Sequence, residues 1–150
     1  MPNNFAFIDG QNVHLGISAL GWKLGWKRFR VHLNESYGVT TAYIFMGFLP
    51  ENQGLYQSLQ RSGYVLIFKP VTYRGGGKAK GNVDAELVLQ AMIDLDKYEK
   101  AVIVTSDGDF ACLVRYLYEK GRLERVLSPN RKGRSALLKR AAREKVDFLE

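Results

Sequence analysis

Four aspartates of this chain sit where they could come together, and clustered carboxylates can bind a divalent cation. Asp9 directly follows the apolar run FAFI, and Asp107 directly follows the run AVIVTS, with Asp109 two residues later. Asp84 is the second residue of a stretch with helical periodicity. Carboxylate oxygens are the ligands that Mg²⁺ and Mn²⁺ prefer. The residue types therefore indicate metal-dependent chemistry, provided that the fold brings these segments to one edge.

Each aspartate also has a purely structural interpretation. Aspartate is favoured as a helix cap and in the first helical turn, which would account for Asp84, Asp107 or Asp109 taken singly. Asp9, in the sequence DGQN, could form a turn. Taken together, the four are harder to explain in this way, because like charges gathered at one edge repel one another unless a cation binds.

Other polar residues near the aspartates have two interpretations each. Asn12 either caps a helix or orients a phosphate or a water molecule, and Thr105 and Ser106 are either caps or phosphate contacts. The two histidines, His14 and His32, are not at metal-ligand spacing from each other, so neither is assigned a catalytic role.

Short apolar runs alternate with helical stretches along the chain, which predicts an α/β fold. Near-continuous apolar runs are typical of parallel strands buried on both faces, and right-handed crossovers place helices on both sides of such a sheet. We therefore expect one domain over residues 1–150, a Rossmann-like three-layer sandwich with a mostly parallel sheet of about five to six strands. The predicted strands are Phe5–Ile8, Val39–Phe48, Tyr64–Tyr73, Ala101–Ser106, Arg122–Leu127 and Val146–Leu149. The predicted helices are Glu51–Arg61, Val83–Lys100, Asp107–Lys120 (stopped by Gly121), Ser135–Glu144, and Gln11–Tyr37 in two pieces broken around Gly21 and Gly25.

In sheets of this kind the functional site lies at the carboxyl ends of the strands, near the point where strand order reverses. Asp9 and Asp107 follow two predicted strands directly. The helix that carries Asp84 must begin on the same edge. The fold therefore predicts that the four aspartates converge.

The glycine-rich segment RGGGKAKGN, residues 74–82, does not match a phosphate-binding loop. Ala79 stands where that loop needs serine or threonine. The segment is predicted to be a mobile flap beside the carboxylates, where Arg74, Lys78 and Lys80 could hold a phosphate backbone. A surface loop without such a role is the alternative.

Composition restricts the classes of protein further. Hydrophobic residues make up 46%, enough for a core, and no apolar run approaches the roughly 20 residues of a membrane span. Neither a secretory signal nor a membrane partner is expected. The single cysteine, Cys112, is predicted to be an inert core thiol, which together with these features indicates a cytoplasmic setting.

The net charge of +7 is concentrated toward the carboxyl end of the chain. Nine basic residues lie between positions 122 and 145, against Glu124 and Glu144, and a second basic stretch runs from Lys69 to Lys80. Such clustering is typical of proteins that bind polyanions, although a solvated surface would also explain it.

Three motifs, FIDGQNV, NVDAELVLQAMID and VTSDGDFACLV, resemble the NYN domain, a branch of the PIN-like nucleases. The resemblance runs from about Phe5 to Leu149, with the motifs in the family's order. It implies a PIN-like fold and a Mg²⁺- or Mn²⁺-dependent phosphodiesterase acting on RNA. Gly108 stands where serine is commoner and is expected to loosen the turn. By this resemblance the catalytic residues are Asp9, Asn12, Asp84, Asp107 and Asp109.

The function expected from residues and resemblance together is that of a metal-dependent nuclease. Asp9, Asp84 and Asp107 are expected to ligate one metal, and Asp109 to complete the site or orient its water. RNA is the favoured partner, single-stranded DNA is an alternative, and the oligomeric state, a homodimer included, is left open. The expected substrate contacts are Ser106, Arg74, Lys78, Lys80, Arg131, Lys132 and Arg134.

Three other functions compete with this one. The first is a non-catalytic nucleic-acid-binding module that retains the nuclease fold. The second is a phosphotransfer receiver, disfavoured because its third strand should end in an aspartate and here it runs on into Val71, Thr72 and Tyr73. The third is a phosphatase with an Asp-x-Asp nucleophile, disfavoured because residue 11 is Gln11.

Overall fold

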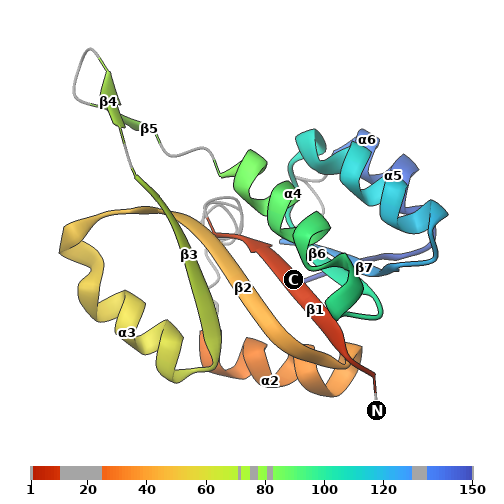
Figure 1. Cartoon of the computed structure of the whole chain (residues 1–150), viewed down its shortest axis with the longest axis horizontal. Coiled ribbons are helices and arrows are strands. Elements are labelled where there is room, and N and C mark those ends of the chain that lie inside the picture. Colours follow the sequence, from red (N-terminus) through yellow and green to blue (C-terminus); the bar gives the residue numbers. More distant parts are fainter. Residues whose placement is uncertain are drawn as a thin grey trace.

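The computed structural model describes residues 2–10, 25–70, 72–74, 78–80, 83–129 and 135–149. Six strands form one sheet in the order β3-β2-β1-β6-β7-β8, and every pairing in it is parallel (Figure 1). Two short strands, β4 and β5, pair antiparallel in a separate sheet. The strands are β1 (Asn4–Asp9), β2 (Val39–Phe48), β3 (Tyr64–Pro70), β4 (Thr72–Arg74), β5 (Lys78–Lys80), β6 (Ala101–Val104), β7 (Leu123–Ser128) and β8 (Val146–Phe148).

Five α-helices among the described residues cover the two faces of the sheet (Figure 1). Helices α4, α5 and α6 pack on one face, and α2 and α3 contribute to the core on the other. The result is the three-layer α/β sandwich that the sequence predicts. The helices are α2 (Trp26–Tyr37), α3 (Gln53–Arg61), α4 (Asp84–Ile93), α5 (Ala111–Glu119) and α6 (Ala136–Ala142), with 3-10 turns η1 (Pro50–Asn52), η2 (Leu95–Lys97) and η3 (Gly108–Phe110).

The helices bury the residues that the apolar periodicity indicates. On the first face, Leu87 of α4 and Leu117 of α5 are fully buried with Phe7 of β1. On the second, Leu33 of α2 packs against the other side of the same strand, at Ile8. Gly121, with a φ of 69°, follows α5 as the predicted stop, since this left-handed backbone suits glycine. The core is thus two apolar layers separated by the sheet.

Strand order reverses between β1 and β6. From β1 the chain moves outward through β2 to β3, and the second half starts beside β1 at β6 and moves the other way. Ile8 of β1 is level with Val104 of β6. The residues that follow these two strands therefore meet at the topological switch point, where sheets of this kind carry their sites.

Some boundaries differ from the predicted ones. The predicted strand Tyr64–Tyr73 ends at Pro70, because proline has no N–H with which to extend the ladder. The predicted helix Val83–Lys100 ends at Ile93 and is followed by η2. Of the two pieces predicted within Gln11–Tyr37, the second is α2, and residues 11–24 lie outside the described ranges.

One expectation about surface features is wrong, and one stays a prediction. The segment predicted to be a flap contains the paired strands β4 and β5, and its role as a flap stays a prediction. Cys112 is exposed and not a core thiol, because the buried stripe of α5 is formed by Leu113, Val114 and Leu117. Within the described ranges, none of the helices has the length and apolar character of a membrane span.

Candidate metal centre

Three of the four aspartates converge at the carboxyl edge of the sheet. Asp9 is the last residue of β1, Asp84 the first residue of α4, and Asp107 lies between β6 and η3. One carboxylate oxygen from each lies within 4.8 Å of the others. We call Asp9, Asp84 and Asp107 the carboxylate cluster. Its members come from sequence positions far apart, so only the sheet order brings them together.

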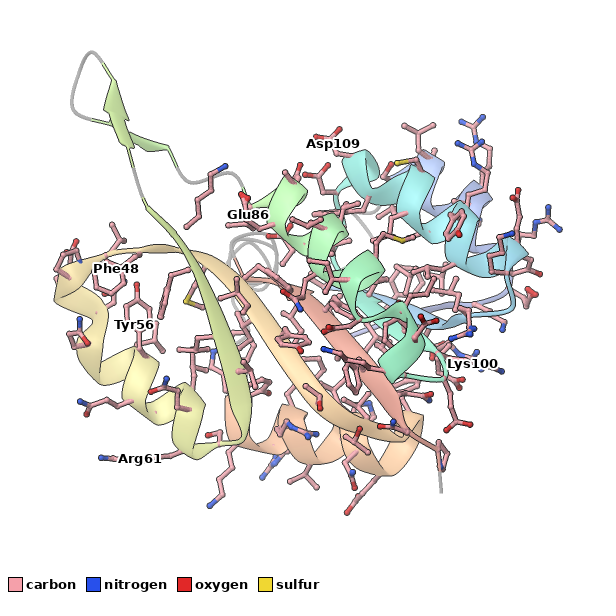
Figure 2. All side chains as sticks on the ribbon, viewed as in Figure 1. Phe48, Tyr56, Arg61, Glu86, Lys100 and Asp109 are labelled. Carbon is pink, nitrogen blue, oxygen red and sulfur yellow. The ribbon has the colours of Figure 1, made fainter. Side chains whose placement is uncertain are left out.

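The fourth aspartate lies beside this cluster. Asp109 is exposed in η3, and its backbone N–H donates a hydrogen bond of 2.9 Å to Oδ1 of Asp107. Figure 2 shows Asp109 and Glu86 near the carboxyl end of the sheet, with Arg61 and Lys100 toward the opposite edge. Asp107 therefore caps η3, as its structural interpretation predicts, and it is also a member of the carboxylate cluster.

Capping does not account for the other two members. Asp9 ends a strand and is only 4% exposed. Asp84 is not the capping residue of α4, because Val83 occupies that position and makes no side-chain capping bond. Asp84 does lie in the first turn of α4, which the helix dipole favours, but capping bonds alone do not explain why the three carboxylates lie together.

Thr105 connects two members of the cluster. Its hydroxyl donates to Oδ2 of Asp9 at 3.2 Å and accepts from the backbone N–H of Asp107 at 3.0 Å. Thr105 is fully buried, and its own N–H donates to the carbonyl of Leu127 in β7. One side chain thus fixes Asp9 relative to the turn that carries Asp107. The sequence offers Thr105 only as a cap or a phosphate contact.

The electrostatic strain of the cluster appears at Asp84. The pKa of Asp84 is raised to about 6, first by burial and then by the negative charges of Asp107, Asp9 and Asp109, in that order of importance. An aspartate surrounded by other carboxylates holds its proton because ionisation would add another like charge. A cation at the same position would relieve that repulsion.

The donor set fits a hard divalent cation. Octahedral Mg²⁺ with oxygen ligands at about 2.1 Å places its donor atoms roughly 3–4 Å apart. The 4.8 Å limit within the cluster is close to that spacing, so small side-chain movements would suffice. All three donors are carboxylates, which suit Mg²⁺ or Mn²⁺ better than zinc.

Other predicted site residues are placed differently. Ser106 is predicted as a substrate contact, yet it is only 8% exposed and its hydroxyl hydrogen-bonds with that of Ser128 at 2.8 Å. Its burial indicates that Ser106 helps to position the residues at the carboxyl edge of the sheet. Asn12 and the contacts Arg131, Lys132 and Arg134 lie outside the described residues. Arg74 lies in β4 and Lys78 and Lys80 in β5.

Gly108 leaves room for a neighbouring element, while the loosening of the turn expected from the sequence stays a prediction. The turn η3 is formed, and a Cβ at Gly108 would lie 2.4 Å from Oγ and 3.2 Å from Cβ of Ser135. Ser135 in turn caps α6 by accepting a hydrogen bond from the N–H of Leu137. The absence of a side chain at Gly108 therefore allows α6 to begin directly against the turn between Asp107 and Asp109.

Three of the described basic residues near the carboxyl end make contacts within the fold. The guanidinium of Arg122 donates to the carbonyls of Leu95 and Tyr98, both at 3.0 Å. Arg125 pairs with Asp147 at 3.4 Å, and the ammonium of Lys145 donates to a backbone carbonyl of β7. These three cations stabilise the fold. The sequence alone does not indicate which basic residues make contacts within the fold.

Comparison with known proteins supports the same fold. The family model described as NYN domain matches residues 5–149. The crystal structure of a protein of unknown function from Vibrio parahaemolyticus superposes with a TM-score of 0.83 at 21% identity, over 99% of this chain and 93% of that one. At that identity the likeness shows the fold alone. No curated protein matches the chain significantly.

Proposed function

The chain belongs to the NYN domain family, a group of PIN-like nucleases, and from that premise we propose that it is a divalent-metal-dependent nuclease acting on RNA. The observation that carries the proposal is the carboxylate cluster at the switch point of the sheet. Mg²⁺ or Mn²⁺ is the proposed cofactor, with Asp9, Asp84 and Asp107 as its ligands. A divalent cation there would offset charge on the scissile phosphate and lower the pKa of a water molecule.

The residues around the cluster have distinct roles in this proposal. The hydroxyl of Thr105 holds Asp9 and Asp107 in place, and Ser106, buried against Ser128, supports the segment that leads to Asp107. Asp109, exposed beside Asp107, and Asn12 orient the attacking water and the phosphate. Hydrolysis consumes one water: its oxygen forms a new bond to phosphorus, an ester P–O bond breaks, and a proton ends on the leaving oxygen.

Basic residues supply the proposed contacts with the nucleic-acid backbone. Phosphate contacts position a substrate without reading its sequence. The charge of +7 supports a polyanionic substrate, and RNA is preferred over single-stranded DNA on the family's account. The proposed contacts are Arg74, Lys78, Lys80, Arg131, Lys132 and Arg134.

Replacing Asp107 by asparagine tests the catalytic proposal. Asp107→Asn removes a charged ligand while an amide oxygen can still cap η3, so cleavage should fall at least about a hundredfold with the fold intact. The measurement is cleavage of labelled RNA and single-stranded DNA with Mn²⁺ and with EDTA. Asp96→Asn, an exposed change in η2, is the matched control.

The same assay separates the nuclease from its main competitor, a non-catalytic binding module. That module would bind RNA but show no metal-dependent cleavage in the wild type. Cleavage by Asp107→Asn at the wild-type rate would place the chemistry elsewhere or reveal a contaminant.

A further inference from the structure

The turn that follows α6 has a backbone conformation that normally requires glycine. Arg143, the residue directly after α6, has a φ of 55° and a ψ of −120°. The N–H of Lys145 donates a hydrogen bond of 3.0 Å to the carbonyl of Ala142, so Arg143 is the second residue of a turn with type II′ geometry. That position strongly favours glycine, because a Cβ strains the backbone there.

Glycine fills the comparable positions elsewhere in the part of the chain that the structure describes. The other residues with a positive φ are Gly38, Gly63 and Gly121, which follow α2, α3 and α5. Arg143 is the only described residue other than glycine with such a φ. Backbone strain of this kind is commonest at functional sites, where a particular side chain is required. A role for the Arg143 side chain is therefore expected.

Contacts within the fold explain this side chain only in part. The guanidinium of Arg143 stands over the ring of Tyr118, 4.9 Å from the ring centroid, and the ammonium of Lys145 lies 5.8 Å from the same centroid. Glu144 accepts a hydrogen bond from the Tyr118 hydroxyl. A cation–π contact at the protein surface is weak compared with the strain of a residue other than glycine in this turn. The Tyr118 ring therefore orients Arg143 more than it compensates for the strain.

Arg143 belongs to a group of cations at the end of α6. Lys139 and Arg140, in the last turn of the helix, are exposed, as is Arg143, and we call these three residues the α6 cations. Glu144 is the only acidic residue from position 135 to position 145. The helix dipole favours cations at this end and would explain Lys139 and Arg140. It does not explain an arginine in a turn that favours glycine.

The α6 cations lie a short distance from the carboxylate cluster. Helix α6 begins against the turn that follows Asp107, where a Cβ at Gly108 would lie 2.4 Å from Oγ of Ser135. At a rise of about 1.5 Å per residue, Arg143 is about 12 Å from Ser135 along the helix. Stacked nucleotides of one strand are about 3.4 Å apart, so about three to four nucleotides span that distance. Figure 1 shows α6 beside α5, on the face of the sheet that α4 also covers.

We propose that the α6 cations bind the phosphate backbone of the RNA beside the carboxylate cluster, and that Arg143 is the residue that the strained turn presents for this contact. The inference rests on the proposed function for the identity of the polyanion. A guanidinium can donate two parallel hydrogen bonds to one phosphate, which a lysine ammonium does not. The turn thus holds a guanidinium at the surface, at a position where glycine would be more stable.

Two substitutions at Arg143 separate a binding role from a structural one. Arg143→Gly and Arg143→Ala both remove the guanidinium, but only glycine relieves the strain of the turn. The glycine variant should therefore melt about 3–6 °C above the alanine variant. Both should lose about threefold in affinity for RNA, with a salt slope lower by about 0.7, as for one phosphate contact on a single strand. Because the glycine variant is the more stable, its loss of binding cannot come from unfolding.

The measurement is fluorescence anisotropy of a fluorescein-labelled single-stranded RNA of about 12 nucleotides, in EDTA to prevent cleavage, over a range of salt concentrations. The triple variant Lys139→Ala/Arg140→Ala/Arg143→Gly should lose about 30-fold in affinity, with a salt slope lower by about 2 units. Arg143→Lys keeps the charge, so it should keep the salt slope of the wild type. Thermal melting of every variant shows whether it is folded.

The control variant is Lys27→Ala/Arg28→Ala/Arg61→Ala. It removes the same charge as the triple variant from exposed residues of α2 and α3, the helices that contribute to the core on the other face of the sheet. Equal net charge in the two variants isolates the effect of position. The control variant should bind the RNA more tightly than the triple variant does, because its missing charges are far from α6.

Three binding results would overturn the inference: a wild type that does not bind the RNA, Arg143→Gly and Arg143→Ala variants that bind as tightly as the wild type, or equal losses in the triple and control variants. An alanine variant as stable as the glycine variant would contradict the strained turn from which the role of Arg143 is inferred. Failure of the catalytic proposal would appear separately, as RNA that is bound through the α6 cations but not cleaved with Mn²⁺.

Discussion

Asp84 is the residue at which the repulsion within the carboxylate cluster is concentrated. Its pKa is about 6 in the folded chain, against an ordinary value of 3.8 for aspartate. The folded state holds this proton more tightly than the unfolded state does. The contribution of Asp84 to the free energy of unfolding is therefore greatest below pH 4. It falls as the pH rises toward 6. The clustered carboxylates thus lower the stability of the metal-free protein at neutral pH.

Replacing Asp84 by asparagine should therefore stabilise the metal-free protein above pH 6 and have little effect near pH 4. The expected gain is roughly 1–2 kcal/mol, discounted from about 1.4 kcal/mol per pKa unit for solvent screening, or about 3–6 °C. Thermal melting in EDTA at both pH values measures it. Asp96→Asn should change neither value, and a destabilised Asp84→Asn at pH 8 would contradict a strained cluster.

Thr105 acts on the site through other residues. Thr105→Val keeps the shape but removes the hydroxyl that links Asp9 to the N–H of Asp107. We expect Mn²⁺ affinity to fall about 10- to 100-fold, as when a partner of a metal ligand is lost. Calorimetric titration with Mn²⁺ measures this, and Thr105→Ser should bind almost as the wild type does. Equal affinities for valine and serine variants would rule out the positioning role.

At the scale of elements, the close contact between η3 and α6 determines where the carboxyl-terminal segment begins. Ser135 lies against Gly108 and caps α6. The segment that holds Arg131, Lys132 and Arg134 directly precedes Ser135. Gly108 therefore couples the position of the start of α6 to that of Asp107 and Asp109.

Gly108→Ala should lower the melting temperature by about 2–4 °C. The new Cβ would force Ser135 out of its capping position, at a cost of about 1 kcal/mol. Gly54→Ala is the matched control, because a Cβ at Gly54 would meet nothing within 4 Å and alanine favours the α3 helix. Its melting temperature should rise. A Gly108→Ala protein as stable as Gly54→Ala would show that α6 does not depend on this contact.

At the scale of the whole molecule, the carboxylate cluster contrasts with a chain that is positively charged overall. The carboxylate cluster lies at one edge of a chain whose net charge is +7. Part of the positive charge, at Arg122, Arg125 and Lys145, is used in contacts that hold the fold. Arg122 and Lys145 keep their charge in these contacts with neutral carbonyls, so they still add to the field that attracts a polyanion.

A ligand that binds only the folded form raises its stability by mass action. Mn²⁺ at a hundredfold excess over its Kd should stabilise the protein by roughly 2.7 kcal/mol, on the order of 5–10 °C. Melting of the wild type and Asp84→Asn, each with EDTA and with Mn²⁺, measures this. The rise should be smaller in Asp84→Asn, and equal melting temperatures in all four conditions would contradict a shared metal site.

The sequence by itself determined the local structure of this protein. Strands such as Val39–Phe48 and the stop at Gly121 follow from apolar periodicity and backbone preference over a few neighbouring residues. The same periodicity placed Asp9 at the end of a strand. Because parallel strands share one carboxyl edge, the approach of Asp9 to Asp107 could be expected once the fold class was known.

Only the tertiary structure decided which side chains are partners. Thr105 bonds to Asp9 across 96 positions, and Ser106 is buried against Ser128, because strand order and register bring these residues together. The pairing of β4 with β5 was not predicted, because strands of three residues are too short to show an apolar periodicity. Exposure of Cys112 depends likewise on which face of α5 meets the sheet. Local sequence fixes the period of an element, but its neighbours fix what each side chain touches.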